Sequence, residues 1–274
     1  MVLSPLAAQD SLTAGDAAWA RRAEGHQGGH AAAGPINEAV AAYERAVKEQ
    51  PERLEGYWKL LRALHYKGDF TTDSKEAKQK AFGRGKEVAE AAFDRLAKRT
   101  AGSREKLDAL APAQAARAVA GVPEAKPLFL WSAVHWGLWG DVFGRLAAAR
   151  QGVGDRVRRD AEVLIALDER YEDAGGHRVL GRLHTLAPKV PFVTGWVDRA
   201  KAVSELRKAV AIGPDNLDNH LFLAEALLEH QSAKAGEARE ILRRLLARKP
   251  VPELMVEQER TLANARALLA KNPG

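Results

Sequence analysis

Three side chains in the apolar segment 127–143 are spaced so that they could bind a small ligand. Trp131, His135 and Trp139 follow one another at intervals of four residues, which places them on one face of a helix. Apolar walls with a few polar groups are typical of small-molecule sites, so this face predicts a pocket. The alternative is a packed core in which His135 has one hydrogen-bond partner.

Two further groups of polar residues could bind an anionic or polar ligand. His177 and Arg178 follow a glycine pair at 175–176, and a helix that starts there would offer free N–H groups and a cation to a carboxylate or phosphate. The alternative is a glycine that ends the preceding helix, followed by two surface residues. Asn219 and His220 lie in the first turn of another predicted helix, where they could contact a ligand on a concave surface or belong to a capped helix start.

Sequence patterns typical of enzymes and metal sites are missing. His26 and His30 are four residues apart but lie in a glycine-rich loop, and no HExxH pattern occurs. The segment GRGK (83–86) lacks the earlier glycine of a phosphate-binding loop and is followed by Glu87 instead of Ser or Thr. The chain has no cysteine, which excludes thiol catalysis and cysteine-based zinc sites. We therefore expect a non-enzymatic protein without a metal or cofactor.

The helices that must position these residues share a repeated pattern of three apolar residues, small or large, followed by a proline. We call this pattern the frame. Steps of four and three residues place the frame on one helical face, and a proline five residues later ends the helix. This pattern is typical of the second helix of a tetratricopeptide (TPR) hairpin, and 89–96 repeats its spacing without the proline. The frame occurs as Ala39, Tyr43, Ala46 and Pro51; as Ala202, Leu206, Ala209 and Pro214; and as Ala238, Leu242, Leu245 and Pro250.

The segment 127–143 itself is apolar all round, with Phe129, Trp136 and Phe143 on faces other than that of Trp131. A helix of this kind is expected to be buried, so the segment predicts the centre of the domain. The fold class predicted from these patterns is all-α: a TPR-like array of helical hairpins, an α-solenoid, with a buried central aromatic helix. Two glycines, Gly83 and Gly85, interrupt the long helix predicted at 72–99 and indicate a close helix contact or a kink.

Length, charge and hydropathy limit the class of protein and the domain organisation that the sequence can encode. The 274 residues carry a net charge of +6, but basic and acidic residues alternate, which indicates solvated helix faces and no nucleic-acid groove. No run reaches the ~20 apolar residues that a transmembrane helix needs. We expect a flexible N-terminus at 1–10, TPR-like helices at 11–99 and one continuous helical region at 100–271. The N-terminus resembles the end of a signal peptide, with a mature start near Gln9; the alternative is a frayed cytoplasmic N-terminus.

The region 107–271 resembles the TatT family, the T-component associated with TRAP transporters. The resemblance depends on motifs in a fixed order rather than on one specific motif. They are the tryptophan-rich segment from Leu130 to Trp139, Tyr171 with Gly175 and Gly176, Leu180-Gly181, the frame at Ala202, and a final helix with Asn264, Ala265, Leu268 and Leu269.

This resemblance implies an all-helical periplasmic protein that pairs with a solute-binding protein of a TRAP transporter. It also implies an internal site for an apolar or amphipathic ligand and, in some members, trimers. The expected ligand-binding residues are then Phe129, Trp131, His135, Trp136, Trp139, Tyr171, His177, Arg178, Asn219 and His220. The chain departs from the family in lacking an anchoring cysteine and in the many basic residues of its C-terminal repeats. The alternative function is a general TPR scaffold for protein–protein interaction in the cytoplasm.

Overall fold

Helices make up almost all of the described chain, as its content of alanine, leucine, arginine, glutamate and lysine predicts. The computed structural model describes residues 5–190 and 194–274, and no β-strand occurs in these two ranges, which confirms the all-α class. The α-helices are α1 (Pro5–Ala20), α2 (Ala33–Glu49), α3 (Leu54–Phe70), α4 (Lys75–Thr100), α5 (Arg104–Ala109), α6 (Pro112–Val119), α7 (Ala125–Phe143), α8 (Arg145–Arg150), α9 (Val153–Leu167), α10 (Tyr171–Leu186), α11 (Arg199–Ile212), α12 (Leu217–His230), α13 (Ala235–Leu246) and α14 (Met255–Lys271).

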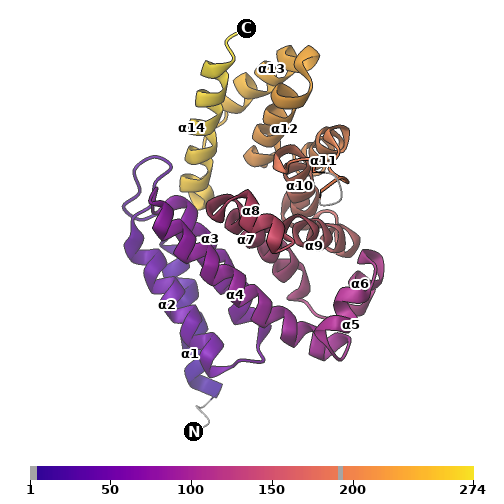
Figure 1. Ribbon diagram of the computed structural model, residues 1–274. Helices are drawn as coiled ribbons and strands as arrows, with labels where there is room; N and C mark the ends of the chain where they lie inside the picture. The colour runs from indigo at the N-terminus through magenta and orange to yellow at the C-terminus, as the bar shows by residue number, and fades with distance from the viewer. Residues whose placement is uncertain (1–4, 191–193) are drawn as a thin grey trace.

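The helices form two groups that α7 and α9 join (Figure 1). In the N-terminal group, α1 to α4 each pack against the next helix along the chain. In the C-terminal group, α10 to α13 do the same, and α14 packs against α12 and α13. Because α7 contacts α4 and α3 on one side and α9 on another, it lies between the two groups. Two 3₁₀ turns, Ser232–Lys234 and Pro252–Leu254, precede α13 and α14.

The apolar residues of the three repeated frames are buried, and their prolines lie just beyond helix ends. Pro51, Pro214 and Pro250 follow the last turns of α2, α11 and α13, because proline cannot continue the helical hydrogen-bond ladder. The large residues of the frames, Tyr43 and Leu206, have no exposed surface. The apolar spacing therefore predicted the inward faces of these helices correctly.

The sequence predicts a last helix at about 253–271 that covers the exposed end of the helical array. The observed helix, α14, contacts both groups of helices. In α14, Val256 belongs to the N-terminal hydrophobic cluster, whereas Leu262 belongs to the C-terminal one. Glu257 of the same helix accepts a 2.9 Å hydrogen bond from Arg22, which follows α1. Polar and apolar contacts of α14 thus join the beginning of the chain to its end.

Helix α1 lies partly within the segment 1–10, which was expected to be a flexible N-terminus. This helix begins at Pro5, so residues 5–10 of the segment expected to be flexible are helical, while residues 1–4 lie outside the described residues. The sequence also has an insertion at 191–197, before the frame at Ala202, and such insertions in repeat proteins often form the binding edge. Its residues 191–193 lie outside the described residues. Of the helices in the described part of the chain, none combines the length and the apolar character needed to cross a bilayer.

Candidate functional site

Half of the ten candidate residues lie on α7, near the middle of the molecule (Figure 1). Its segment 127–140 contains no Asp, Glu, Lys or Arg, so each of its faces can be buried against a neighbouring helix. The long helix α4 runs antiparallel to it, since Gln79 donates to the carbonyl of Val142 at one end and Phe93 contacts Phe129 at the other. The aromatic side chains of α7 therefore meet a different surface at each end of the helix.

His135 lies in the contact between α7 and α4. The side chain has no exposed surface, and its Nε2 donates a 2.8 Å hydrogen bond to the carbonyl oxygen of Leu61. Space for the ring comes from Gly85, where a Cβ atom would lie 2.0 Å from Nδ1 of His135. Burial lowers the pKa of His135 to about 3, although the bond to Leu61 opposes this shift. His135 is thus a neutral core histidine at pH 7, as the packed-core alternative requires.

The two aromatic residues that precede His135 on α7 also make internal contacts. Phe129 is buried and meets the ring of Phe93 edge-on, with ring centroids 4.8 Å apart. Trp131 is partly buried, and its ring centroid lies 5.2 Å from that of His65 on α3. These aromatic pairs tie α7 to α4 and α3. We call Phe129 and His135, which are fully enclosed, the sealed part of α7.

At the C-terminal end of α7 the aromatic side chains reach the surface. The ring of Trp139 stacks on that of Phe143 at 4.7 Å, and Phe143 is 40% exposed. Leu146 of α8 is 66% exposed. The ammonium group of Lys86 lies 4.4 Å from the ring centroids of both Trp136 and Trp139, a cation–π arrangement. We call Trp139 and Phe143, together with the adjacent Leu146 of α8, the open end of α7. The exposure of Phe143 shows that the prediction of an entirely buried helix is wrong here.

His177 is paired with a carboxylate inside the C-terminal group of helices. Its Nδ1 lies 2.5 Å from Oε2 of Glu205 on α11, and Lys208 donates to the other oxygen at 3.0 Å. Burial alone would raise the pKa of Glu205, but the hydrogen bonds from His177 and Lys208 outweigh it and lower this pKa to about 2. The contact between His177 and Glu205 therefore joins α10 to α11 in a buried position.

The predicted residues Arg178 and Asn219 are brought into direct contact. Nη1 of Arg178 donates to Oδ1 of Asn219 at 3.0 Å. The amide nitrogen of Asn219 donates to the carbonyls of Asp173, Ala209 and Gly213 at 2.9–3.0 Å. The Asn219 side chain has no exposed surface, so its hydrogen-bonding capacity is largely used within the fold.

A short left-handed turn explains why these groups meet. Residues 172–174 have positive φ angles of 49–66°, although none of them is glycine. Right-handed helix resumes at the Gly175-Gly176 pair, which the sequence had placed at a helix junction, and the preceding α9 ends at Leu167. Arg178 stabilises the turn by donating to the carbonyls of residues 172 and 173, both at 3.2 Å.

The remaining predicted residues lie apart from these groups. Tyr171 packs against the N-terminal hydrophobic cluster, and burial raises its pKa. His220 is partly exposed and lies at a hydrogen-bond distance of 2.8 Å from the carbonyl of Pro214. Eight of the ten candidate residues thus divide between α7 and the α10–α12 polar contacts, and Tyr171 and His220 lie apart from both groups.

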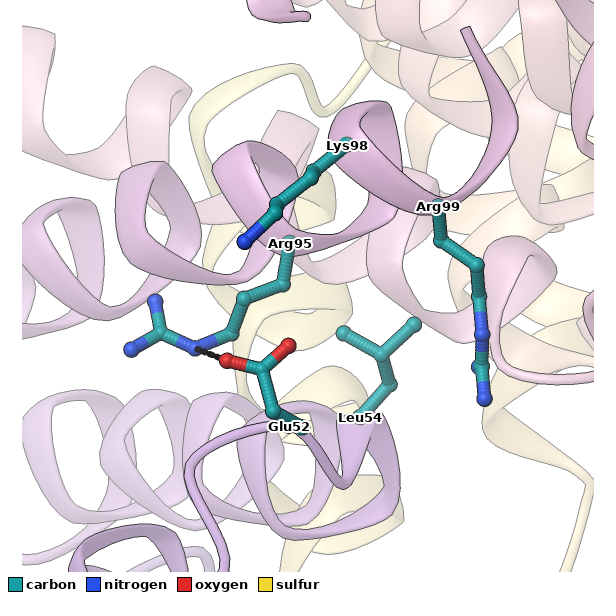
Figure 2. A pocket seen from close by; sticks show the side chains of 5 residues that line it. All are labelled: Glu52, Leu54, Arg95, Lys98 and Arg99. Carbon is teal, nitrogen blue, oxygen red and sulfur yellow. Dashed lines mark ion pairs between the residues drawn. The ribbon is translucent and has the colours of Figure 1, made fainter. Parts of the chain in front are cut away.

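Two of the hollows on the described surface are lined by none of the ten candidate residues. One lies beside the loop after α1 and is lined by Gly25, Gln27, His30, Ala31, Ala32, Ala33 and Thr71. The other has a volume of about 290 Å³ and lies between the start of α3 and the end of α4 (Figure 2). It is lined by Glu52, Leu54, Arg95, Lys98 and Arg99.

Sequence reasoning missed this basic hollow, although a signal for it was present. Arg95, Lys98 and Arg99 have the i, i+3, i+4 spacing that places three side chains on one helical face. It also missed Lys86 and Glu205, because their partners Trp139 and His177 are 53 and 28 residues away in the sequence and no local pattern connects them.

Comparisons with known proteins add no further assignment. No protein-family model matches the sequence, and no curated protein is significantly similar to it. Within residues 5–190 and 194–274, no cluster of three or more His, Asp or Glu side chains could hold a metal ion.

Proposed function

We propose that this protein is a non-enzymatic, TPR-like helical-repeat protein, an α-solenoid, that docks a protein partner. One shared feature of two helix pairs carries the proposal. A Cβ atom on Gly15 of α1 would lie 2.4 Å from the ring of Tyr43, and one on Gly181 of α10 would lie 2.6 Å from Cγ of Leu206. Tyr43 and Leu206 hold the same position in their frames, and the TPR sequence pattern likewise has a glycine in its first helix and a large residue in its second.

The partner we propose is the periplasmic solute-binding protein of a TRAP-type transporter, as the TatT resemblance implies. The support is the ordered series of motifs across 107–271 and the presence of the aromatic helix between two groups of stacked helices. The apolar or amphipathic ligand that the resemblance also implies would bind at the open end of α7. His135 and Phe129 are enclosed by neighbouring helices, whereas Phe143 offers accessible aromatic surface.

The test is a binding measurement between the purified full chain and TRAP solute-binding proteins encoded near its gene. We expect a complex that elutes as one species in size-exclusion chromatography and gives a saturable calorimetric titration. A solute-binding protein of an ATP-driven transporter serves as the control and should not bind. Binding of neither protein, together with capture of short peptides by the same chain, would replace this proposal with the general cytoplasmic scaffold.

The compartment and the oligomeric state are tested separately. A periplasmic protein is released from cells by osmotic shock, whereas a cytoplasmic one remains in the spheroplast fraction. Light scattering coupled to chromatography distinguishes a monomer from the trimer that the resemblance implies. These two measurements do not depend on knowing the ligand.

A further inference from the structure

The hollow between α3 and α4 is basic and partly preformed. The side chains of Arg95, Lys98 and Arg99 extend from one face of α4, opposite Glu52 and Leu54 (Figure 2). Three cations face a single carboxylate, so the hollow carries an excess of positive charge. Its volume of about 290 Å³ is close to the lower limit of small-molecule sites, ~300 Å³.

The guanidinium group of Arg95 is fixed by hydrogen bonds within the protein itself. Its Nη1 donates to the carbonyl of Ala91 at 2.7 Å, and its Nε donates to the carbonyl of Pro51. The guanidinium carbon lies 5.1 Å from the ring centroid of Tyr57, whose hydroxyl donates to the same Pro51 carbonyl at 2.9 Å. A guanidinium that is fixed in this way loses little conformational entropy when it binds an anion.

The other two cations of the hollow do not pair with other side chains of the described residues. Lys98 and Arg99 are exposed and have no hydrogen bond or ion pair with any described residue. Nearby acids on α4 are engaged elsewhere, since Glu90 and Asp94 pair with Arg104 at 3.3 and 3.4 Å. The basic residues at the end of α4 also interact favourably with the helix dipole, but that interaction leaves their N–H groups free to bind a ligand.

Glu52 shows what kind of group the hollow accepts. Its carboxylate lies 4.0 Å from Nε of Arg95, at the outer limit of an ion pair, and its side chain is 78% exposed. Exposed pairs of this kind contribute ~0–1 kcal/mol, so an incoming anion can displace Glu52 easily. Leu54, which is buried, forms an apolar wall beside the charged groups.

We propose that this hollow is an anion-binding site that takes a single carboxylate or phosphate group. Arg95 is the fixed donor, Lys98 and Arg99 close over the bound group, and Glu52 occupies the site weakly in its absence. The anion can come from an acidic side chain of a partner or from a free small molecule. The proposal does not rest on the docking function above, because it concerns a different surface.

The test is a titration of the ¹⁵N-labelled full chain followed by NMR. Inorganic phosphate and N-acetylglutamate are added separately at constant ionic strength, with sodium chloride as the reference. We expect saturable shifts of the amides of Leu54, Arg95 and Arg99 with at least one of them. Saturation by phosphate alone assigns a free or esterified phosphate, and saturation by N-acetylglutamate assigns a carboxylate. No saturation with either probe would overturn the proposal.

Variants separate a specific site from general charge attraction. Lys98→Gln with Arg99→Gln should weaken binding about tenfold, because two exposed cations that pair with the bound anion are removed. Glu52→Gln should tighten binding by about threefold, since the competing carboxylate is removed. The matched control, Lys75→Gln with Lys80→Gln, removes the same charge from the exposed start of α4. Equal weakening by both double variants, with unchanged melting temperatures, would mean that no defined site exists.

Discussion

The sealed part and the open end of α7 are both rich in aromatic residues, but one is buried and the other reaches the surface. Phe129 and His135, in the sealed part, touch the interior sides of α4 and α3, and neither is more than 2% exposed. Trp139 and Phe143, at the open end, stack on one another instead, and Phe143 is 40% exposed. The difference arises from the neighbouring helices, because α4 offers a glycine opposite His135 and a lysine opposite Trp139.

This comparison shows that an apolar segment does not by itself determine burial. The hydrophobic effect favours burial wherever a complementary surface is available, and close packing decides whether that surface can be reached. Gly85 allows α4 and α7 to approach closely at one point, whereas Lys86, the next residue, covers the rings of the open end with its ammonium group. Adjacent residues on α4 thus produce a sealed and an open region on α7.

The largest expected contrast comes from truncating one aromatic ring in each region. Phe129→Ala should cost about 3–5 kcal/mol of unfolding free energy, because it leaves a cavity beside Phe93. Phe143→Ala should cost less than about 1 kcal/mol, since the ring is already partly in water. Urea denaturation of both variants measures the contrast. Equal losses would show that the open end is covered in solution.

The second prediction concerns the helix contact that creates the sealed part. Gly85→Ala should destabilise the fold by about 2–3 kcal/mol, because its Cβ would lie 2.0 Å from the buried ring of His135. The matched control is Gly83→Ala on the same helix, where a Cβ meets nothing within 4 Å. That change should stabilise the protein by about 0.5–1 kcal/mol through helix propensity. Similar effects at both positions would contradict the close contact at Gly85.

Part of this arrangement could be predicted from the sequence. Local spacing predicted the inward faces of the helices in the repeated frames. The capped helix start considered for Asn219 is also observed, because Asn216 accepts from the amides of Asp218 and Asn219 at the start of α12. A close contact or kink was expected at the two glycines of α4, and Gly85 makes that contact. These features depend on residues within one or two helical turns, which a sequence pattern can represent.

Other features could not be predicted, because they depend on residues far apart in the chain. The left-handed turn at 172–174 contains no glycine, so its residue types do not predict positive φ angles. Hydrogen bonds from Arg178 and Asn219 stabilise it. The contact of α14 with the start of the chain joins Arg22 to Glu257 across 235 residues. Asp141 ends the uncharged run of α7, but this one residue does not show whether the ring of Phe143 is exposed or buried.

The third prediction uses the pKa of His135 to test the sealed part at low pH. Its folded pKa, about 3, lies below its ordinary value of about 6.5, so the unfolded chain takes up a proton first as pH falls. The contribution of neutral His135 to stability is complete above pH 6.5 and declines between pH 6.5 and 3. The expected slope from this one group is about 1.4 kcal/mol per pH unit.

The comparison variant for that measurement is His135→Gln. Glutamine can still donate to the Leu61 carbonyl but does not titrate, so the difference in unfolding free energy between the two proteins should shrink as pH falls. Other groups whose pKa is shifted, such as His184, contribute equally to both proteins and cancel in the difference. Parallel curves from pH 7 to 4 would show that His135 is accessible to protons in the folded state.

The smallest effect is expected at Lys86, which borders the open end. Lys86→Gln should cost about 0.5–1 kcal/mol, because its ammonium group lies 4.4 Å from the ring centroids of Trp136 and Trp139. Lys80→Gln, which removes an exposed charge from the same helix, should cost less than about 0.5 kcal/mol. The two are compared by urea denaturation and by acrylamide quenching of tryptophan fluorescence, where only Lys86→Gln should increase quenching. If Lys86→Gln changed neither quantity, the lysine would not cover these rings in solution, and the open end would be more accessible to a partner or ligand than its contacts indicate.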